Sequence, residues 1–178
     1  QGADELLCGY KKYLGFYVQS LVRSRQYFKA LKILFGFSVN GSIINQFNLQ
    51  EAKRYLPESW KKKEGDIKGP ALQSAMPVAV GLQANQSVIQ PQMTDLKQFS
   101  VPYLTHYEDR MSMAWSREIR LPFLDYRLME FFISLPVSFK MTGGWTKYLF
   151  RKALQNSLPT KIAWRKDKQG FVSPQEEW

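Results

Sequence analysis

Residues 10–35, YKKYLGFYVQSLVRSRQYFKALKILF, decide the fold class of this chain. Aromatic and aliphatic side chains recur there at intervals of three and four residues, which places them on one face of an α-helix. The run is long for one globular helix, and the polar residues 23–25 predict a break within it. The recurring positions are Tyr13, Phe16, Tyr17, Leu21, Tyr27, Phe28, Leu31 and Leu34. The stretch therefore predicts two helices joined by a short turn.

Helical patterns continue in the second half of the chain. Thr94 is predicted to cap a helix that Pro102 either kinks or bounds. The predicted inner face of this helix is Leu96, Phe99, Leu104 and Tyr107. Asp125 is predicted to cap the next helix, which ends at Pro136. The predicted buried side chains of that helix are Leu128, Met129, Phe131 and Phe132.

The last predicted helix opens at Thr146 and ends before Pro159. Its predicted inward side chains are Tyr148, Leu149, Phe150 and Leu154. A shorter helix is predicted over 49–55, and residues 57–91, rich in Pro, Gly, Gln and Asn, are predicted to form an irregular connector. No stretch alternates with period two, so the chain is predicted to be mainly α, one partial domain over 1–178.

Charge and composition limit the classes of protein. The 178 residues include 25 lysines and arginines against 15 acids, a net charge of +10, which attracts nucleic acid, anionic membranes or nucleotide phosphates. No apolar run reaches the roughly 18 residues of a membrane span. Cys8 is the only cysteine, which excludes an internal disulfide and favours a reducing, cytoplasmic compartment. Cys8 and His106, the only histidine, are interpreted as structural residues, since together they make no zinc site.

The first ten residues, QGADELLCGY, hold the most useful chemistry. Gly2 would let a ligand approach the backbone, and Asp4 offers a hard oxygen to Mg²⁺. The structural alternative is an ordinary acid-rich start of a helix, because acids are favoured at that end in any case.

Two later segments also stand out. Charged and apolar residues alternate over 107–125, which predicts a buried ion-pair network of Asp109, Arg110, Glu118 and Arg120. Residues 164–171, WRKDKQGF, place bases beside a glycine and could neutralise a polyphosphate, although alone they read as a basic loop.

In this order, the three segments resemble the glutamine-hydrolysing asparagine synthetase family, in the later part of its ATP-dependent synthetase domain. The family pattern Gly-Glu-Gly-Ser/Gly-Asp-Glu-x-x-x-Gly-Tyr is similar to residues 1–10. The pattern Asp-Arg-x-Ser-Met-Ala…Ser-x-Glu-x-Arg-x-Pro-Phe-Leu-Asp is similar to residues 109–125, and the family's tail is similar to 144–154 and 168–171.

The resemblance implies a helical C-terminal portion of an α/β adenine-nucleotide-hydrolase-like synthetase domain, of the PP-loop ATP pyrophosphatase type, with its sheet largely missing. It implies a ligase that uses ATP and Mg²⁺ to adenylate the side-chain carboxylate of aspartate. Ammonia from glutamine then gives asparagine, AMP and pyrophosphate. The family's pyrophosphate loop and glutaminase domain have no counterpart in these residues, so we expect the fragment alone to be inactive and to self-associate through apolar faces.

Carried over by position, the resemblance makes Asp4 a Mg²⁺ ligand and gives Gly2 and Lys168 to pyrophosphate binding. Lys168 would also stabilise the charge of the transition state. Gln1 stands where the family usually has a glutamate that helps to form the acyl-adenylate. That departure removes a negative charge from the acceptor pocket and keeps other acceptors open.

Two alternatives therefore stand beside asparagine synthesis. The first is a related adenylating ligase that acts on another carboxylate, of the β-lactam or lasso-peptide type, or a glycan amidotransferase. The second is a basic helical binding module, whose affinity for nucleic acid would fall steeply with salt. The bases gather near Lys168 and no nucleic-acid motif is visible, so the sequence predicts neither a nucleic-acid partner nor a membrane.

Overall fold

The computed structural model describes residues 1–40 and 87–166, and this part of the chain is mainly α, as predicted. The only β-type pairing within it is an isolated bridge between Thr142 and Trp145. The helices are α1 (Ala3–Leu6), α2 (Lys11–Arg23), α3 (Tyr27–Asn40), α6 (Ile89–Lys97), α7 (Ser100–Met113), the 3₁₀ helix η4 (Pro122–Leu124), α8 (Tyr126–Ser134), α9 (Val137–Lys140), α10 (Tyr148–Leu154) and α11 (Thr160–Ala163).

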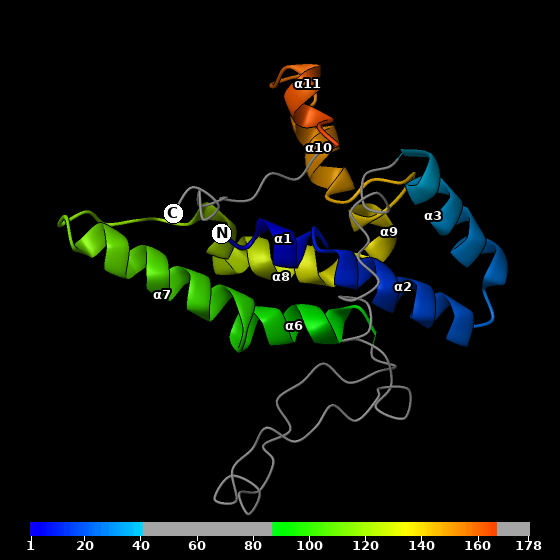
Figure 1. Ribbon diagram of the computed structural model, residues 1–178, viewed down its shortest axis with the longest axis horizontal. Coiled ribbons are helices and arrows are strands. Elements are labelled where there is room, and N and C mark those ends of the chain that lie inside the picture. Colours follow the sequence, from blue (N-terminus) through cyan, green and yellow to red (C-terminus); the bar gives the residue numbers. More distant parts are fainter. Residues whose placement is uncertain (41–86, 167–178) are drawn as a thin grey trace, which may run out of the picture.

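The short helix α1 lies in the middle of the molecule. It contacts α6 on one side and α8 on another, although these helices are far from it in sequence. Helices α6 and α7 follow each other along one side, while α2 and α3 pack together at one end (Figure 1). Helices α10 and α11 project from the opposite side (Figure 1).

The predicted break in the first helical run is confirmed. Helix α2 ends at Arg23, and Arg25 takes a left-handed conformation with φ of 56°. The Gln26 N–H donates to the carbonyl of Leu21 at 2.8 Å, which closes the turn. The left-handed residue reverses the chain, so that α3 returns along α2.

The predicted Thr94 cap is wrong, because Thr94 lies inside α6. That helix begins at Ile89, inside the range predicted as a connector, and the remainder of the connector and the helix over 49–55 fall outside the described residues. Of the two alternatives for Pro102, a kink or a boundary, the structure shows a boundary: α6 ends at Lys97, and Pro102 lies in the first turn of α7. A proline costs little there, since a first-turn N–H has no partner within the helix.

Asp125 caps α8 as predicted. Its Oδ1 accepts a hydrogen bond from the Arg127 N–H at 2.9 Å, and hydrogen bonds from Arg127 lower the pKa of Asp125 to about 2.

The predicted inner faces are only partly correct. Phe132 is buried, yet Leu128 and Phe131 on the same helix are exposed, as is Tyr107 on α7. A local period identifies an apolar helix but does not say which neighbours cover it.

The last predicted helix begins later than expected. Thr146 is not its cap: α10 starts at Tyr148, preceded by Lys147 with φ of 54°. Pro159 lies beyond the end of α10, as predicted, and is the N-cap of α11.

Two apolar clusters form the core, and both draw on the end of α1 and the two residues after it. One contains Leu6 and Leu7 with side chains from α6, α7 and α8, and the other contains Cys8 with side chains from α2 and α3. The first cluster is Leu6, Leu7, Leu96, Val101 and Phe132; the second is Cys8, Tyr13, Leu14, Phe16, Phe37, Val88 and Met141. Helix α1 therefore joins the two clusters.

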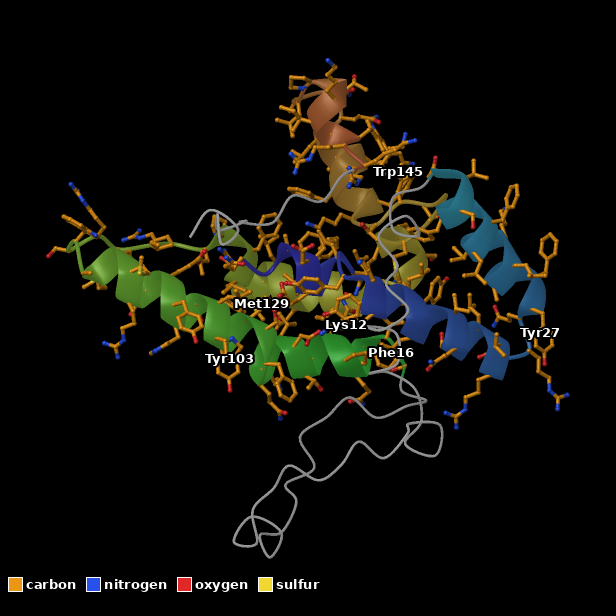
Figure 2. The ribbon with its side chains drawn as sticks, viewed as in Figure 1. Lys12, Phe16, Tyr27, Tyr103, Met129 and Trp145 are labelled. Carbon is orange, nitrogen blue, oxygen red and sulfur yellow. The ribbon has the colours of Figure 1, made fainter. Side chains whose placement is uncertain are left out.

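Outer faces of α3 and α7 are apolar and exposed. On α3, Phe28, Leu31, Phe35 and Val39 are between 66% and 81% exposed. Figure 2 shows Tyr27 and Tyr103 pointing away from the body of the molecule. No helix of the described residues is both long and apolar enough to cross a membrane. Exposed faces of this size fit the predicted self-association, which stays a prediction.

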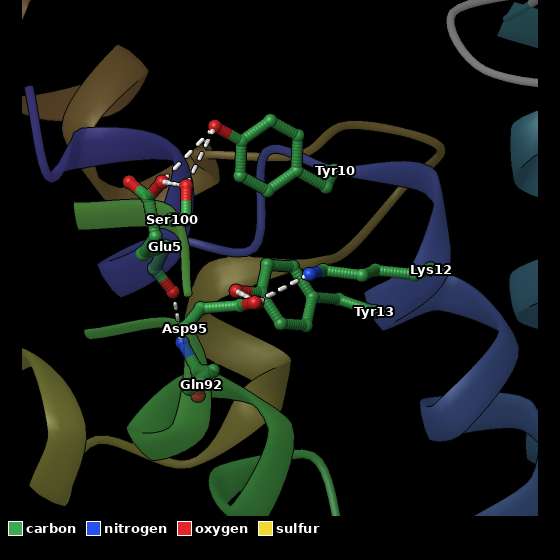
Figure 3. A network of polar contacts seen from close by, with 7 residues as sticks. All are labelled: Glu5, Tyr10, Lys12, Tyr13, Gln92, Asp95 and Ser100. Atoms are coloured by element: carbon green, nitrogen blue, oxygen red, sulfur yellow. Dashed lines mark hydrogen bonds and ion pairs between the residues drawn. The ribbon is translucent and has the colours of Figure 1, made fainter. Parts of the chain in front are cut away.

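A buried polar network holds α1 to α6 and α2 (Figure 3). The amide of Gln92 donates to the carbonyls of Glu5 and Leu6 at 2.6 and 2.9 Å, and accepts from the Lys140 ammonium at 3.2 Å. Asp95, one turn further along α6, accepts from Lys12 Nζ at 2.6 Å and from the Tyr13 hydroxyl at 2.5 Å. Burial and the hydrogen bond to Asp95 raise the pKa of Tyr13.

Replacing Gln92 with leucine is expected to destabilise the fold more than the same change at a nearby site. Gln92→Leu leaves two carbonyls and the Lys140 ammonium without their partner in a buried place, which costs about 2–4 kcal/mol of unfolding free energy. Gln90→Leu is the matched control, since Gln90 is exposed on the same helix and should change stability by less than about 0.5 kcal/mol. Urea unfolding followed by circular dichroism measures both, and equal stabilities would contradict the role of the network.

Candidate functional site

The site begins at Gly2, the N-cap of α1. Gly2 has φ of 93°, a left-handed conformation that glycine adopts without strain. A Cβ built there would lie 2.6 Å from Leu124 Cδ2 in η4. The backbone conformation already favours a glycine here without any ligand, and a side chain at this position would also have to displace Leu124.

After α1 the chain folds tightly back on Asp4. Cys8 is left-handed with φ of 57°, and the Gly9 N–H donates to the Asp4 carbonyl at 2.7 Å. A Cβ at Gly9 would lie 1.9 Å from Asp4 Oδ1 and 2.7 Å from Lys147 Cε. A side chain at position 9 would therefore push the Asp4 carboxylate or the Lys147 side chain out of its present position.

Lys147 completes the arrangement from the far end of the chain. Its Nζ lies 2.9 Å from Asp4 Oδ1, and its backbone N–H donates to the Leu7 carbonyl at 3.1 Å. The two side chains are 28% and 26% exposed, so the pair is reachable from solvent. The contact joins an acid of α1 to a lysine at the start of α10.

The two neighbouring acids of α1 have different tasks. Asp4 faces Lys147, while Glu5 is buried and accepts hydrogen bonds from the Tyr10 hydroxyl, at 3.0 Å, and from the Ser100 hydroxyl. Burial raises the pKa of Tyr10, which keeps this donor protonated. Glu5 therefore belongs to the scaffold, and Asp4 is the acid of α1 that an external ligand can reach.

Asp4 alone does not make a magnesium site. Within residues 1–40 and 87–166 no group of three or more His, Cys, Asp or Glu side chains could hold a metal ion. Mg²⁺ prefers six oxygen ligands and often takes only one or two of them from carboxylates. Asp4 could thus supply one ligand to an ion held mainly by other groups.

Cys8 is a packing residue, as interpreted from the sequence. Its side chain is fully buried, and burial raises the pKa of the thiol to about 12. Lys140 is also buried, which lowers the pKa of its ammonium. His106 is exposed on α7. None of these groups takes part in the arrangement around Asp4.

Arg151 ties the Lys147 turn to the segment that leads toward Lys168. Its guanidinium donates to the carbonyl of Thr146 at 2.9 Å and to that of Ala163 at 2.7 Å. The same group lies 5.0 Å from the ring of Trp145, whose ring centroid is 5.2 Å from that of Trp164. The start of the basic segment is thereby fixed against the Lys147 turn, whereas Lys168 itself lies outside the described residues.

Gln1 contacts α7. Its Nε2 donates to Glu108 Oε1 at 2.6 Å, across 107 positions of sequence.

The prediction of a buried ion-pair network over the neighbouring residues 109–120 is wrong. Arg120 and Glu118 do pair at 3.1 Å, but they are 85% and 72% exposed, and Asp109 and Arg110 are exposed on α7. Alternation of charged and apolar residues reflects here a helix end and an exposed extended segment.

Sequence reasoning missed two residues of this site, Lys147 and Glu108. Lys147 is one base among several near the C-terminus, and the Gly143-Gly144 pair, which indicates a turn, is the one local signal beside it. Glu108 stood beside the Asp109–Arg110 motif with no signal of its own. Both residues belong to the site only because they contact residues 1–4, which are more than 100 positions away in the sequence.

Comparison with known proteins shows the family of this chain. The asparagine synthase family matches residues 1–178. Asparagine synthetase [glutamine-hydrolyzing] 3 of Bacillus subtilis is 46% identical over 59 residues, which are 33% of this chain and 10% of the relative. Asparagine synthetase [glutamine-hydrolyzing] 1 of the same organism is 41% identical over 70 residues, or 39% and 11% of the two chains.

A vertebrate relative shows the same pattern. The asparagine synthetase [glutamine-hydrolyzing] of Gallus gallus is 36% identical over 76 residues, 39% of this chain and 14% of the relative. No solved structure is a significant match. The chain belongs to the asparagine synthase family, since the match covers its whole length, and its aligned residues span only 10–14% of the length of these three relatives.

Exchanging Gly9 for alanine tests the packing around Asp4. The new Cβ would displace the Asp4 carboxylate from Lys147, and we expect Gly9→Ala to lower the unfolding free energy by about 1–3 kcal/mol. Gly15→Ala is the matched control, because nothing lies within 4 Å of a Cβ at Gly15, and alanine in helix α2 should raise stability by up to about 1 kcal/mol. Urea unfolding of both variants gives the comparison, and a Gly9→Ala protein as stable as the parent would refute the close approach.

Proposed function

We propose that this chain is part of a glutamine-dependent asparagine synthetase. In the proposed reaction the side-chain carboxylate of aspartate attacks the α-phosphorus of ATP, and pyrophosphate leaves. Ammonia released from glutamine then attacks the acyl carbon of the aspartyl-adenylate, so that AMP leaves and asparagine forms. Membership of the asparagine synthase family over residues 1–178 supports this proposal, together with the names of the relatives.

The observation that carries the proposal is the Asp4–Lys147 pair on its tight turn. A carboxylate is a poor electrophile, so the reaction needs an adenylate leaving group and an arrangement of charges that offsets the phosphates. Asp4 and Lys147 place a carboxylate and an ammonium group 2.9 Å apart, with 26% and 28% of the two side chains exposed, held by the Gly9 turn and by Arg151. A fixed, reachable pair of opposite charges suits a divalent ion and a phosphate group together.

The residue roles follow from this arrangement. Asp4 is a ligand of Mg²⁺, and when bound the ion neutralises part of the charge of ATP and pyrophosphate. Gly2 and Lys168 bind pyrophosphate, Lys147 adds a second cation beside Asp4, and Lys168 and Gln1 take part in catalysis. ATP and Mg²⁺ are thus the proposed cofactors. A cytoplasmic location belongs to the same proposal, since the only cysteine is a buried thiol and the reaction consumes ATP.

A related ligase that acts on another carboxylate is the second candidate. Gln1 is the observation in its favour, because an amide stands where the family pattern has a glutamate. The binding-module alternative is weaker, since Lys147 and Lys12, two of the bases it would need, are paired with the acids Asp4 and Asp95.

Pyrophosphate release by the full-length protein that contains this chain tests the function. With ATP, Mg²⁺ and glutamine present, release of pyrophosphate and AMP should require aspartate, and asparagine should accumulate in equal amount. Omission of aspartate is the control. Release that does not depend on aspartate, or depends on another carboxylate, would replace asparagine synthesis by the second candidate.

Lys168→Ala in the full-length protein tests the predicted cation. Loss of a charge that stabilises the transition state should lower kcat for pyrophosphate release by about 100-fold or more. Lys161→Ala is the matched control, because Lys161 is an exposed base on α11, outside residues 164–171, and the variant should retain activity within a few-fold. Activity of Lys168→Ala close to that of the parent would remove Lys168 from the mechanism.

A further inference from the structure

We infer that Glu108, held by Gln1, binds the amino group of the acceptor amino acid. The inference rests on the proposed function and assigns a residue that the family pattern of residues 1–10 does not include. Glu108 lies on α7, and Gln1 precedes Gly2 and α1. The site therefore gains an acid from an element that contributes nothing to the Asp4–Lys147 pair.

The amide of Gln1 fixes Glu108 without changing its charge. Gln1 Nε2 donates to Glu108 Oε1 at 2.6 Å, so one carboxylate oxygen is held in place. Because an amide is neutral, it neither neutralises the carboxylate, as a lysine would, nor repels it, as a second acid would. The pair thus presents a carboxyl group in a defined orientation.

The second oxygen of the carboxylate lacks a donor. Glu108 Oε2 is buried and accepts no hydrogen bond from the described part of the chain, and no ion pair reaches Glu108 there. A buried carboxylate oxygen without a donor lowers the stability of the fold, because no hydrogen bond compensates for the lost hydration. The arrangement of Glu108 is therefore explained if a donor arrives with a ligand.

An ammonium group suits this oxygen better than a metal ion. It carries one positive charge and three N–H donors, and so pairs with a single carboxylate. A divalent ion would need further oxygen ligands, and no metal-binding cluster of acids exists in residues 1–40 and 87–166. Aspartate, the proposed acceptor, carries its ammonium group on the carbon next to the side chain that reacts.

Glu108 is accordingly a positioning and specificity residue. It contacts the α-ammonium group of the acceptor. The reacting side-chain carboxylate is then free to meet ATP beside Asp4 and Lys147. It should therefore select amino acids over the corresponding deamino acids, since an acceptor without the ammonium group leaves the buried Oε2 of Glu108 without a donor.

The experiment compares aspartate with succinate, which has the same carboxylates and no amino group, in the full-length protein. The measured quantity is kcat/KM for pyrophosphate release with each acceptor. The parent should prefer aspartate by about 100-fold or more. Glu108→Gln, which keeps the shape and removes the charge, should lower kcat/KM for aspartate by about 30–100-fold while leaving that for succinate within a few-fold. Glu118→Gln, an exposed acid, is the control and should leave both values unchanged.

The ratio of the two acceptors decides the outcome. A Glu108→Gln protein that loses activity equally with aspartate and succinate has a structural defect, and the inference is then wrong. A variant that keeps its preference for aspartate also overturns it. If the parent uses another carboxylate in place of aspartate, the proposed function fails, and the amino and deamino forms of that acceptor test Glu108 in the same way. An unchanged ratio there overturns the inference as well.

Discussion

The hydrogen bonds from Gln92 to the last turn of α1 are the contacts on which the rest of this structure depends. A helix of four residues does not persist by itself, because nucleation is costly and so few internal hydrogen bonds repay it. Gln92 supplies donors to the carbonyls of Glu5 and Leu6, while Leu6, Leu7 and Cys8 enter two apolar clusters. The segment that carries Gly2 and Asp4 is thus held by the core instead of by its own hydrogen bonds.

Because α1 is held in this way, its two adjacent acids have different roles: one stabilises the fold and the other belongs to the candidate site. Glu5 points inward to Tyr10 and Ser100, where burial makes it a fixed acceptor, and Asp4 points outward to Lys147. The change of direction follows from the helical geometry of α1, since consecutive residues are about 100° apart around the axis. The left-handed Cys8 and the absence of a side chain at Gly9 then bring the turn back against Asp4. A small segment can in this way present one acid to a ligand while the other secures it.

The proposed site gathers residues from three distant parts of the chain. Gln1 and Asp4 come from the first residues, Glu108 from α7, and Lys147 from the turn before α10, which Arg151 holds through backbone carbonyls. The Asp4–Lys147 pair is suited to the phosphate side of an adenylating reaction, and the Gln1–Glu108 pair to the amino acid. The negative phosphates and the positive ammonium group are then bound by two separate pairs of residues. Neutral Gln1 fits this division, because the negative charge of the acceptor side comes from Glu108 on another helix.

Sequence patterns alone predict the helical class, the break between α2 and α3, the Asp125 cap and the family, whereas they leave Pro102 open between a kink and a boundary. These features depend on local periodicity, on backbone stereochemistry or on motifs, and each of these can be recognised from residues close together in the sequence. The packing of the helices shows what these patterns could not: Tyr107 and Phe131 face solvent, and Thr94 lies inside a helix. The charged residues predicted as a buried network over 109–120 are exposed. The tertiary structure also decided that Lys147 meets Asp4 and that Glu108 meets Gln1. Burial and long-range pairing depend on which elements lie against each other in space, and a local pattern contains no information on neighbours 100 residues away.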